Sequence, residues 1–236
     1  LLSLVTAVGL IFLLPSTNQL GEKSKAVKNK ASLFIPTILT LLYALSFATL
    51  PPIFRAAIAI TALGYTMIVY CAQRKFTPGL GGLLLLALPV TASLQFYLGY
   101  PMRVFVGLLA SPMLNLAGFA VVREGACLKW GDQLIVIDAP CSGVRMMWAA
   151  LFLTFTLAAL NQFGWLKSGL AVLLSFIAVL LGNTLRAAAL FYLEAGIIHL
   201  PAWAHDAAGV IVFLVLAVGL VIVNKELQRV KLCVQS

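Results

Sequence analysis

Apolar runs alternate with short polar or basic segments along almost the whole chain. A helix that crosses a bilayer needs about 20 mostly apolar residues. Seven stretches approach or exceed that length, namely 1–16, 31–50, 53–72, 79–99, 142–162, 169–196 and 209–224. A further apolar stretch, 104–120, is short and contains Pro112 and Asn115. We expect it to form an interfacial or re-entrant helix; the alternative is an eighth span, which would reverse the sides assigned below.

Composition agrees with a membrane protein. The chain is 62% hydrophobic and 10% charged, whereas soluble domains carry about 25% charged residues. The net charge of +9 comes from basic residues spread over short loops, as in membrane proteins, so we expect no nucleic-acid partner. We predict an all-α membrane protein, a bundle of about seven transmembrane helices in contact with lipid. Its parts are 1–99, with four helices, and 100–236, with an outer loop (100–141), three helices and all of the candidate reactive residues considered below.

The basic residues also assign the sides of the membrane. Residues 22–30 carry four lysines and are therefore expected in the cytoplasm. Alternation then places residues 100–141 and 197–208 outside, although Arg103, Arg123 and Lys129 lie in the first of these loops. We predict a multi-pass protein of the plasma (inner) membrane with these two loops facing the outside or periplasm.

The outer loop has a strand-like pattern of its own. Residues 129–132 read Lys-Trp-Gly-Asp, which is a turn signal, and the β-prone run Leu134–Ile137 follows. We expect a small β-hairpin on the outer surface. Pro140 breaks the chain just after it, so the hairpin would deliver Cys141 to the start of the next helix.

Cys141 is the first candidate for chemistry. The N-terminus of a helix carries unpaired amides and partial positive charge, which lower the pKa of a thiol and favour the nucleophilic thiolate. Amides near Ser142 and Gly143 are also suited to stabilising an oxyanion. Arg145 shares a helix face with Cys141, where it either assists the thiolate, holds a substrate carboxylate or contacts lipid headgroups. The alternative for Cys141 is a small buried residue at a helix cap.

Arg186 and His205 are the other two candidates. Arg186 lies inside an apolar run, where a charge costs at least about 2–3 kcal/mol and is usually functional. Asn183 is one turn earlier on the same face and is suited to holding the guanidinium. His205 precedes the last apolar run and is either an acid/base or a solvated loop histidine, with His199 as an alternative. Asp206, next to it, is a candidate helix cap.

Three motifs together resemble those of the exosortase/archaeosortase family. They are Cys-Ser-Gly at 141–143, Asn-x-x-Arg at 183–186 and His-x-x-x-Gly at 205–209, each at the outer edge of a successive span. The resemblance covers about 120–210, including the strand-like loop, while the first four spans match only in being apolar. Family members are polytopic membrane cysteine enzymes that are thought to cleave the C-terminal sorting signal of exported proteins and transfer the new end to another acceptor.

The resemblance implies a role for each motif residue. Cys141 would be the nucleophile of a cysteine protease or transpeptidase, Arg186 the cation of the transition state and His205 the acid/base. Asn183 and Gly209 complete the motifs. The implied partner is a C-terminal sorting-signal peptide of a cell-envelope protein, with an acceptor that the sequence does not name.

Two other classes of protein fit parts of the pattern. A transporter or channel-like protein would use Arg186 as an anion site but gives no reason for Cys141 and His205 to share a side. A scaffold subunit would pair Arg186 with a partner's acidic residue.

Cys127 and Cys141 share one loop, and a disulfide between them would consume the thiol. No spacing resembles a zinc site, and we expect neither metal nor cofactor.

Overall fold

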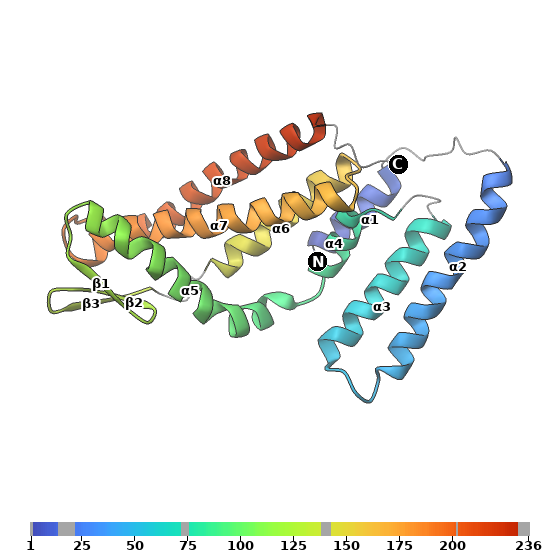
Figure 1. Cartoon of the computed structure of the whole chain (residues 1–236), viewed down its shortest axis with the longest axis horizontal. Coiled ribbons are helices and arrows are strands. Elements are labelled where there is room, and N and C mark those ends of the chain that lie inside the picture. The colour runs from blue at the N-terminus through green and yellow to red at the C-terminus, as the bar shows by residue number, and fades with distance from the viewer. Residues whose placement is uncertain (1, 14–21, 72–75, 138–142, 202, 231–236) are drawn as a thin grey trace. The chain divides into compact units, whose positions relative to one another are not determined.

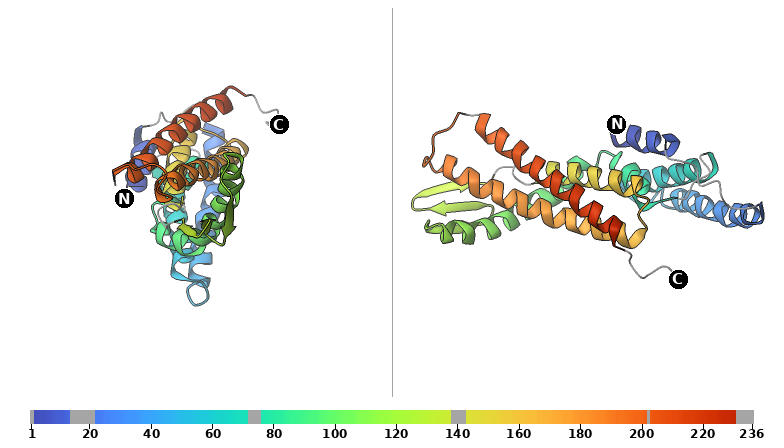
Figure 2. Two further views of the ribbon diagram at one scale, coloured as in Figure 1. Left: turned by 90° about the vertical axis from the view of Figure 1, so that its left-hand side faces the viewer. Right: turned by 90° about the horizontal axis from the view of Figure 1, so that it is seen from above.

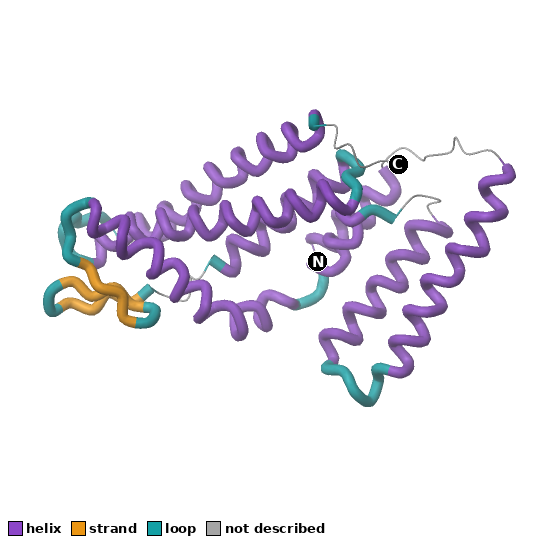
Figure 3. The backbone as a smooth tube through the Cα atoms, in the orientation of Figure 1, coloured by secondary structure: helices purple, strands orange, loops and turns teal. Residues whose placement is uncertain are grey.

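The computed structural model describes residues 2–13, 22–71, 76–137, 143–201 and 203–230. Most of them are helical (Figure 1, Figure 3). The elements are α1 (Leu2–Leu13), α2 (Glu22–Leu45), α3 (Pro52–Thr66) with a π-helical continuation η1 (Met67–Cys71), α4 (Pro78–Leu86), α5 (Val90–Leu116), β1 (Val121–Glu124), β2 (Cys127–Trp130), β3 (Gln133–Val136), α6 (Val144–Leu160), α7 (Trp165–Glu194) and α8 (Trp203–Arg229).

The number of membrane-spanning helices differs from the prediction. Three described helices are long and apolar enough to cross a bilayer: Pro52–Val69, α7 and α8. A fourth is obtained if α4 and α5 count as one broken span, while α1, α6 and the apolar part of α2 are shorter. The expected seven spans are therefore not confirmed, whereas a helical protein with several apolar helices and a small sheet is.

The expected span at 79–99 is divided, and the expected separate segment at 104–120 is absent. Helix α4 ends at Leu86 and α5 begins at Val90, because Pro89 disfavours helical geometry in the residue before it. Helix α5 then continues to Leu116 through Pro101 and Pro112. Each proline removes one bond of the helical ladder, and this helix tolerates both losses.

The described residues form two compact units, 1–90 with 154–169 and 91–153 with 170–236. In the first unit, α2 and α3 run side by side (Figure 1), and α4 packs against α1 and α3. Arg55 closes the connection between α2 and α3 by donating to the Phe47 carbonyl at 2.9 Å. A Cβ on Gly79 would collide with the backbone of Ala159, so α4 and the end of α6 pack at backbone distance.

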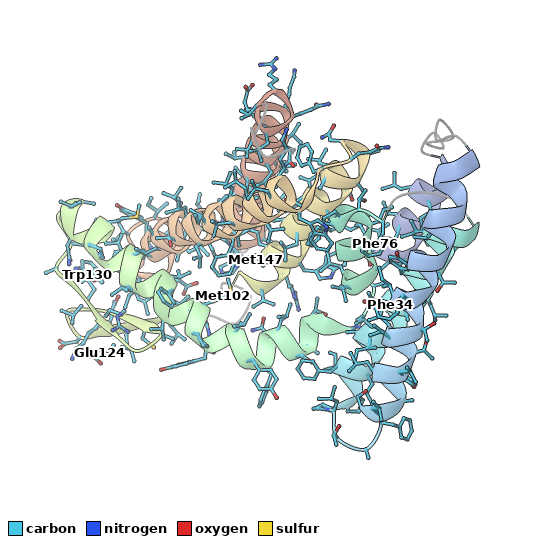
Figure 4. All side chains as sticks on the ribbon, turned by 45° about the vertical axis from the view of Figure 1, so that its right-hand side comes forward. Phe34, Phe76, Met102, Glu124, Trp130 and Met147 are labelled. Carbon is cyan, nitrogen blue, oxygen red and sulfur yellow. The ribbon has the colours of Figure 1, made fainter. Side chains whose placement is uncertain are left out.

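The second unit carries the sheet and all of the candidate motifs. Helices α7 and α8 cross each other within it (Figure 2). One hydrophobic cluster joins α5, the sheet and α7, with Val106, Leu128 and Phe191 almost fully buried. A second cluster joins α5, α6, α7 and α8 and includes Met102 and Met147 (Figure 4). These clusters hold the sheet and the first turn of α6 against the C-terminal half of α7.

The sheet is antiparallel, with strand order β1-β2-β3. Both connections are two-residue loops, because Glu124 pairs with Cys127 and Trp130 with Gln133. Each loop begins with a glycine of positive φ, +62° at Gly125 and +58° at Gly131, as type II′ hairpin turns require. The predicted hairpin turn at 131–132 is confirmed, and β1 adds a strand that the prediction lacked.

An aromatic cluster fastens the sheet to α7. Phe119, Trp130, Phe191 and Tyr192 meet edge to face, with ring centroids 5.3 to 5.9 Å apart, and Trp130 is labelled in Figure 4. Such pairs contribute about 0.5–1.5 kcal/mol each beyond their buried area. The sheet is therefore fixed to the helix that carries Asn183 and Arg186.

Candidate active site

Arg186 is buried in α7 and lies against the backbone of α8. Only 8% of the surface of Arg186 is exposed. A Cβ built on Gly209 would stand 3.2 Å from Cζ and Nη2 of Arg186 and 3.3 Å from its Nε. The guanidinium therefore occupies the space that any side chain at position 209 would need. The second and third motifs meet through this contact.

Asn183 makes the corresponding contact with the first motif. It is fully buried, and a Cβ on Gly143 would lie 3.1 Å from its Nδ2. Gly143 has φ +78°, and its carbonyl accepts a 2.7 Å hydrogen bond from the amide of Met147. It thus stands directly before α6, in a conformation that favours glycine. Both the backbone angle and the neighbouring amide group account for glycine here.

His205 belongs to the first turn of α8, because this helix begins at Trp203, six residues before the expected apolar span. Its side chain is 30% exposed, and Nδ1 lies 3.8 Å from Oδ1 of the exposed Asp206. Asp206 itself is inside the first turn, where a carboxylate interacts favourably with the helix dipole. His205 and Gly209 are four residues apart, so they share one face of α8.

The three residues of α7 that approach the motifs lie on successive turns of this helix. Asn183 meets Gly143, Arg186 meets Gly209 three residues later, and Leu190 shares a pocket with His205 one turn further. Seven residues of helix rise about 10 Å. Residues from all three motifs are thus brought to one short segment of α7.

The pocket beside His205 was not predicted from the sequence. It is a shallow hollow that opens to the surface, and its empty space amounts to about 340 Å³ when the open solvent at its mouth is included. Side chains from β2, β3 and α7 line it, among them Leu128, Ile135, Leu190 and Phe191. Glu194 and His205 are its only ionisable lining residues among those that the structure describes. The continuous apolar run Leu134–Ile137 was the available signal, but it does not reveal which helix the strand faces.

Not every predicted site residue is brought into this arrangement. Cys141 and Ser142 lie outside the described residues. Arg145 is exposed in the first turn of α6 and, within the part of the chain described, takes part in no hydrogen bond or ion pair. His199 is exposed in the loop before α8. Cys127 of β2 has a free thiol. The described ranges contain no group of three or more metal-ligating side chains.

Apolar helices of spanning length, together with an arginine buried in one of them, define a multi-pass membrane protein. The model of one family, described as transmembrane exosortase (Exosortase_EpsH), matches residues 1–222. The chain belongs to this transmembrane exosortase family. No curated protein and no solved structure matches it. Members of the family are membrane cysteine transpeptidases that act on C-terminal sorting signals of exported proteins.

Proposed function

We propose that this protein is a cysteine protease or transpeptidase that cleaves the C-terminal sorting signal of exported proteins at the outer face of the plasma membrane. Cys141 is the nucleophile, Arg186 the cation that stabilises the oxyanion, and His205 the acid/base. The observation that carries the proposal is the pair of contacts that joins the motifs, Asn183 with Gly143 and Arg186 with Gly209. A transporter with an anion site gives no reason for these contacts.

The first half of the reaction is acylation. The Cys141 thiolate attacks the carbonyl carbon of the scissile peptide bond and forms a tetrahedral intermediate. Arg186 stabilises its negative oxygen. The carbon–nitrogen bond then breaks, His205 gives a proton to the leaving amine, and the acyl group remains on Cys141 as a thioester.

The second half releases the acyl group. An amine, a hydroxyl group or water attacks the thioester while His205 takes the proton of the attacking group. The carbon–sulfur bond breaks, and the thiolate of Cys141 is restored. Transfer and hydrolysis differ only in which nucleophile reaches the thioester.

The positions of the described residues support the assignment of Cys141. It precedes Gly143 by two residues, a separation that chain geometry limits to about 7 Å. Gly143 touches Asn183, and Asn183 is three residues from Arg186 on the same side of α7. A substrate carbonyl near Cys141 is therefore within reach of this side of α7.

The test compares Cys141→Ala with Cys127→Ala, the matched change at the free thiol of β2. Each variant is expressed with an exported protein that ends in a C-terminal sorting signal, and processing is followed by the change in its size. We expect the unprocessed form to accumulate with Cys141→Ala alone. A hydroxylamine-sensitive acyl adduct should form on the wild type and be lost in the same variant. Normal processing by Cys141→Ala would overturn the proposal.

Orientation is tested by thiol labelling in intact cells with a membrane-impermeant reagent. The proposed topology places Cys141 outside. The last span, 209–224, then brings the tail with Cys233 into the cytoplasm, so single-cysteine variants at these two positions should label in opposite ways. Labelling of Cys141 only after permeabilisation would show that the assigned sides are wrong.

A further inference from the structure

The pocket beside His205 adjoins a sheet edge to which no described residue hydrogen-bonds. The register of the β2–β3 hairpin determines which amides and carbonyls of β3 bond to β2 and which face away from it. Trp130 and Gln133 flank a two-residue loop and are thus a hydrogen-bonded pair, and the amide of Ile137 donates to the Ala126 carbonyl at 3.1 Å. Hydrogen-bonded pairs alternate along antiparallel strands. Residues 133, 135 and 137 therefore bond β2, while the amides and carbonyls of Leu134 and Val136 face outward.

At the opposite edge of the sheet, α5 covers the start of β1. The amide of Val121 donates to Oδ1 of Asn115 at 2.7 Å, and the Ser111 hydroxyl donates to the Val121 carbonyl at 3.0 Å. Helix α5 thus satisfies the outward groups of Val121. No described residue forms a comparable bond to the outward groups of Leu134 or Val136, whose side chains are 55% and 53% exposed.

From this geometry we propose that the free edge of β3 pairs with the extended segment of the substrate that flanks its scissile bond, and that an apolar side chain of this segment enters the pocket beside His205. This inference rests on the proposed function. Extended peptides add to open sheet edges through main-chain hydrogen bonds, with pockets for alternate side chains. Here the edge supplies two donors and two acceptors, and the pocket offers Leu128, Ile135 and Phe191.

Two features favour a polypeptide over a lipid chain as the occupant. A lipid chain has no groups that could satisfy the outward amides and carbonyls of β3, whereas a peptide backbone satisfies both. The pocket also contains His205, which the proposed mechanism places beside the leaving amine of a peptide. A substrate strand at β3 would thus be held next to the residue that protonates its cleaved bond.

The backbone contact is tested with Leu134→Pro, because proline removes an outward donor without removing a bond to β2. Leu134→Thr is the matched control, since it keeps the amide and a strand-compatible side chain. We expect roughly a fivefold fall in signal processing with Leu134→Pro, the size expected for one lost backbone hydrogen bond, and near wild-type processing with Leu134→Thr. Equal processing by the two variants would overturn strand addition.

The occupant is identified by photocrosslinking in the Cys141→Ala background, where substrate stays uncleaved. A photoreactive residue replaces Leu134 or, as a control on β1 at the opposite edge of the sheet, Val122, which is 62% exposed. Crosslinks to the exported protein from position 134 alone support the inference. Crosslinks to lipid alone, or equal crosslinks from both positions, overturn it.

The pocket is tested by matching its size to the substrate. Ile135→Ala enlarges it, and apolar residues of increasing size are placed at each position around the cleaved bond. We expect Ile135→Ala to process substrates with larger side chains better than the wild type does. For an extended segment, this gain should occur at one substrate position or at alternate positions. If Cys141→Ala abolishes processing while Ile135→Ala shifts no preference, the pocket assignment fails and the proposed function stands. Processing that survives Cys141→Ala would instead overturn the proposed function.

Discussion

Substitution of Gly209 by alanine should separate catalysis from stability. The added Cβ would stand 3.2 Å from Cζ of Arg186, whereas carbon atoms in favourable contact are about 3.5–4.0 Å apart. The guanidinium must therefore retreat by about 0.3–0.8 Å. Helix propensity acts in the opposite direction, since alanine in a helix interior is more stable than glycine by about 0.5–1 kcal/mol.

The expected loss of activity follows from the role proposed for Arg186. Removing one oxyanion donor costs about 10²–10³ in rate, and a misplacement of about 1 Å can cost about 10²-fold. We expect Gly209→Ala to process the sorting signal about 10- to 100-fold more slowly, with unchanged or raised thermal stability in detergent.

Gly219→Ala is the matched control, because Gly219 lies on the same helix and a Cβ there meets no atom within 4 Å. It should gain the same helix propensity and keep its activity. In an Arg186→Ala background, Gly209→Ala should have little further effect on processing, because contacting residues are not additive. Wild-type processing by Gly209→Ala, or equal losses in both glycine variants, would refute the reasoning.

Two further changes test the contacts around α7. Gly143→Ala should abolish most processing, because its Cβ would press on Asn183 and the backbone has φ +78°. Gly196→Ala is the control for the backbone angle, since Gly196 has φ +69° and a Cβ there meets no atom within 4 Å. Equal losses of processing in both variants would show that the contact with Asn183 is not the cause. Phe191→Ala should lower the free energy of unfolding by about 3–5 kcal/mol and release the sheet, measured as faster proteolysis between 121 and 136. Unchanged proteolysis would show that the aromatic cluster does not hold the sheet.

Local patterns in the sequence predicted the features that depend on neighbouring residues. The apolar runs indicated helices, the glycine at 131 indicated a hairpin turn, and three-residue spacing placed Asn183 and Arg186 on one side of a helix. The mostly helical structure and the turn are confirmed, whereas the seven spans are not. The roles of Cys141, Arg186 and His205 stay predictions.

Features that depend on distant residues were missed or misplaced. The sequence predicted separate segments ending at 99 and beginning at 104, yet α5 continues through this region. Met102 and Val106 of α5 are buried against other elements. Strand β1 is four residues long, and the outward groups of its first residue, Val121, are satisfied by Asn115 and Ser111 of α5. The pocket joins strands to α7 and α8. None of these contacts is encoded by spacing within one segment.

The length of α7 has a consequence for the membrane in which the protein works. Its 30 residues extend about 45 Å, while the hydrocarbon core of a bilayer is about 30 Å thick. If the Trp165 end lies at one boundary of that core and α7 stands upright, the final turns, from Arg186 to Glu194, project beyond the other boundary into the headgroup layer. A bilayer with longer acyl chains would draw these turns into hydrocarbon, away from water. The rate of signal processing should therefore depend on acyl-chain length in reconstituted vesicles, with the reaction slowing as the bilayer thickens.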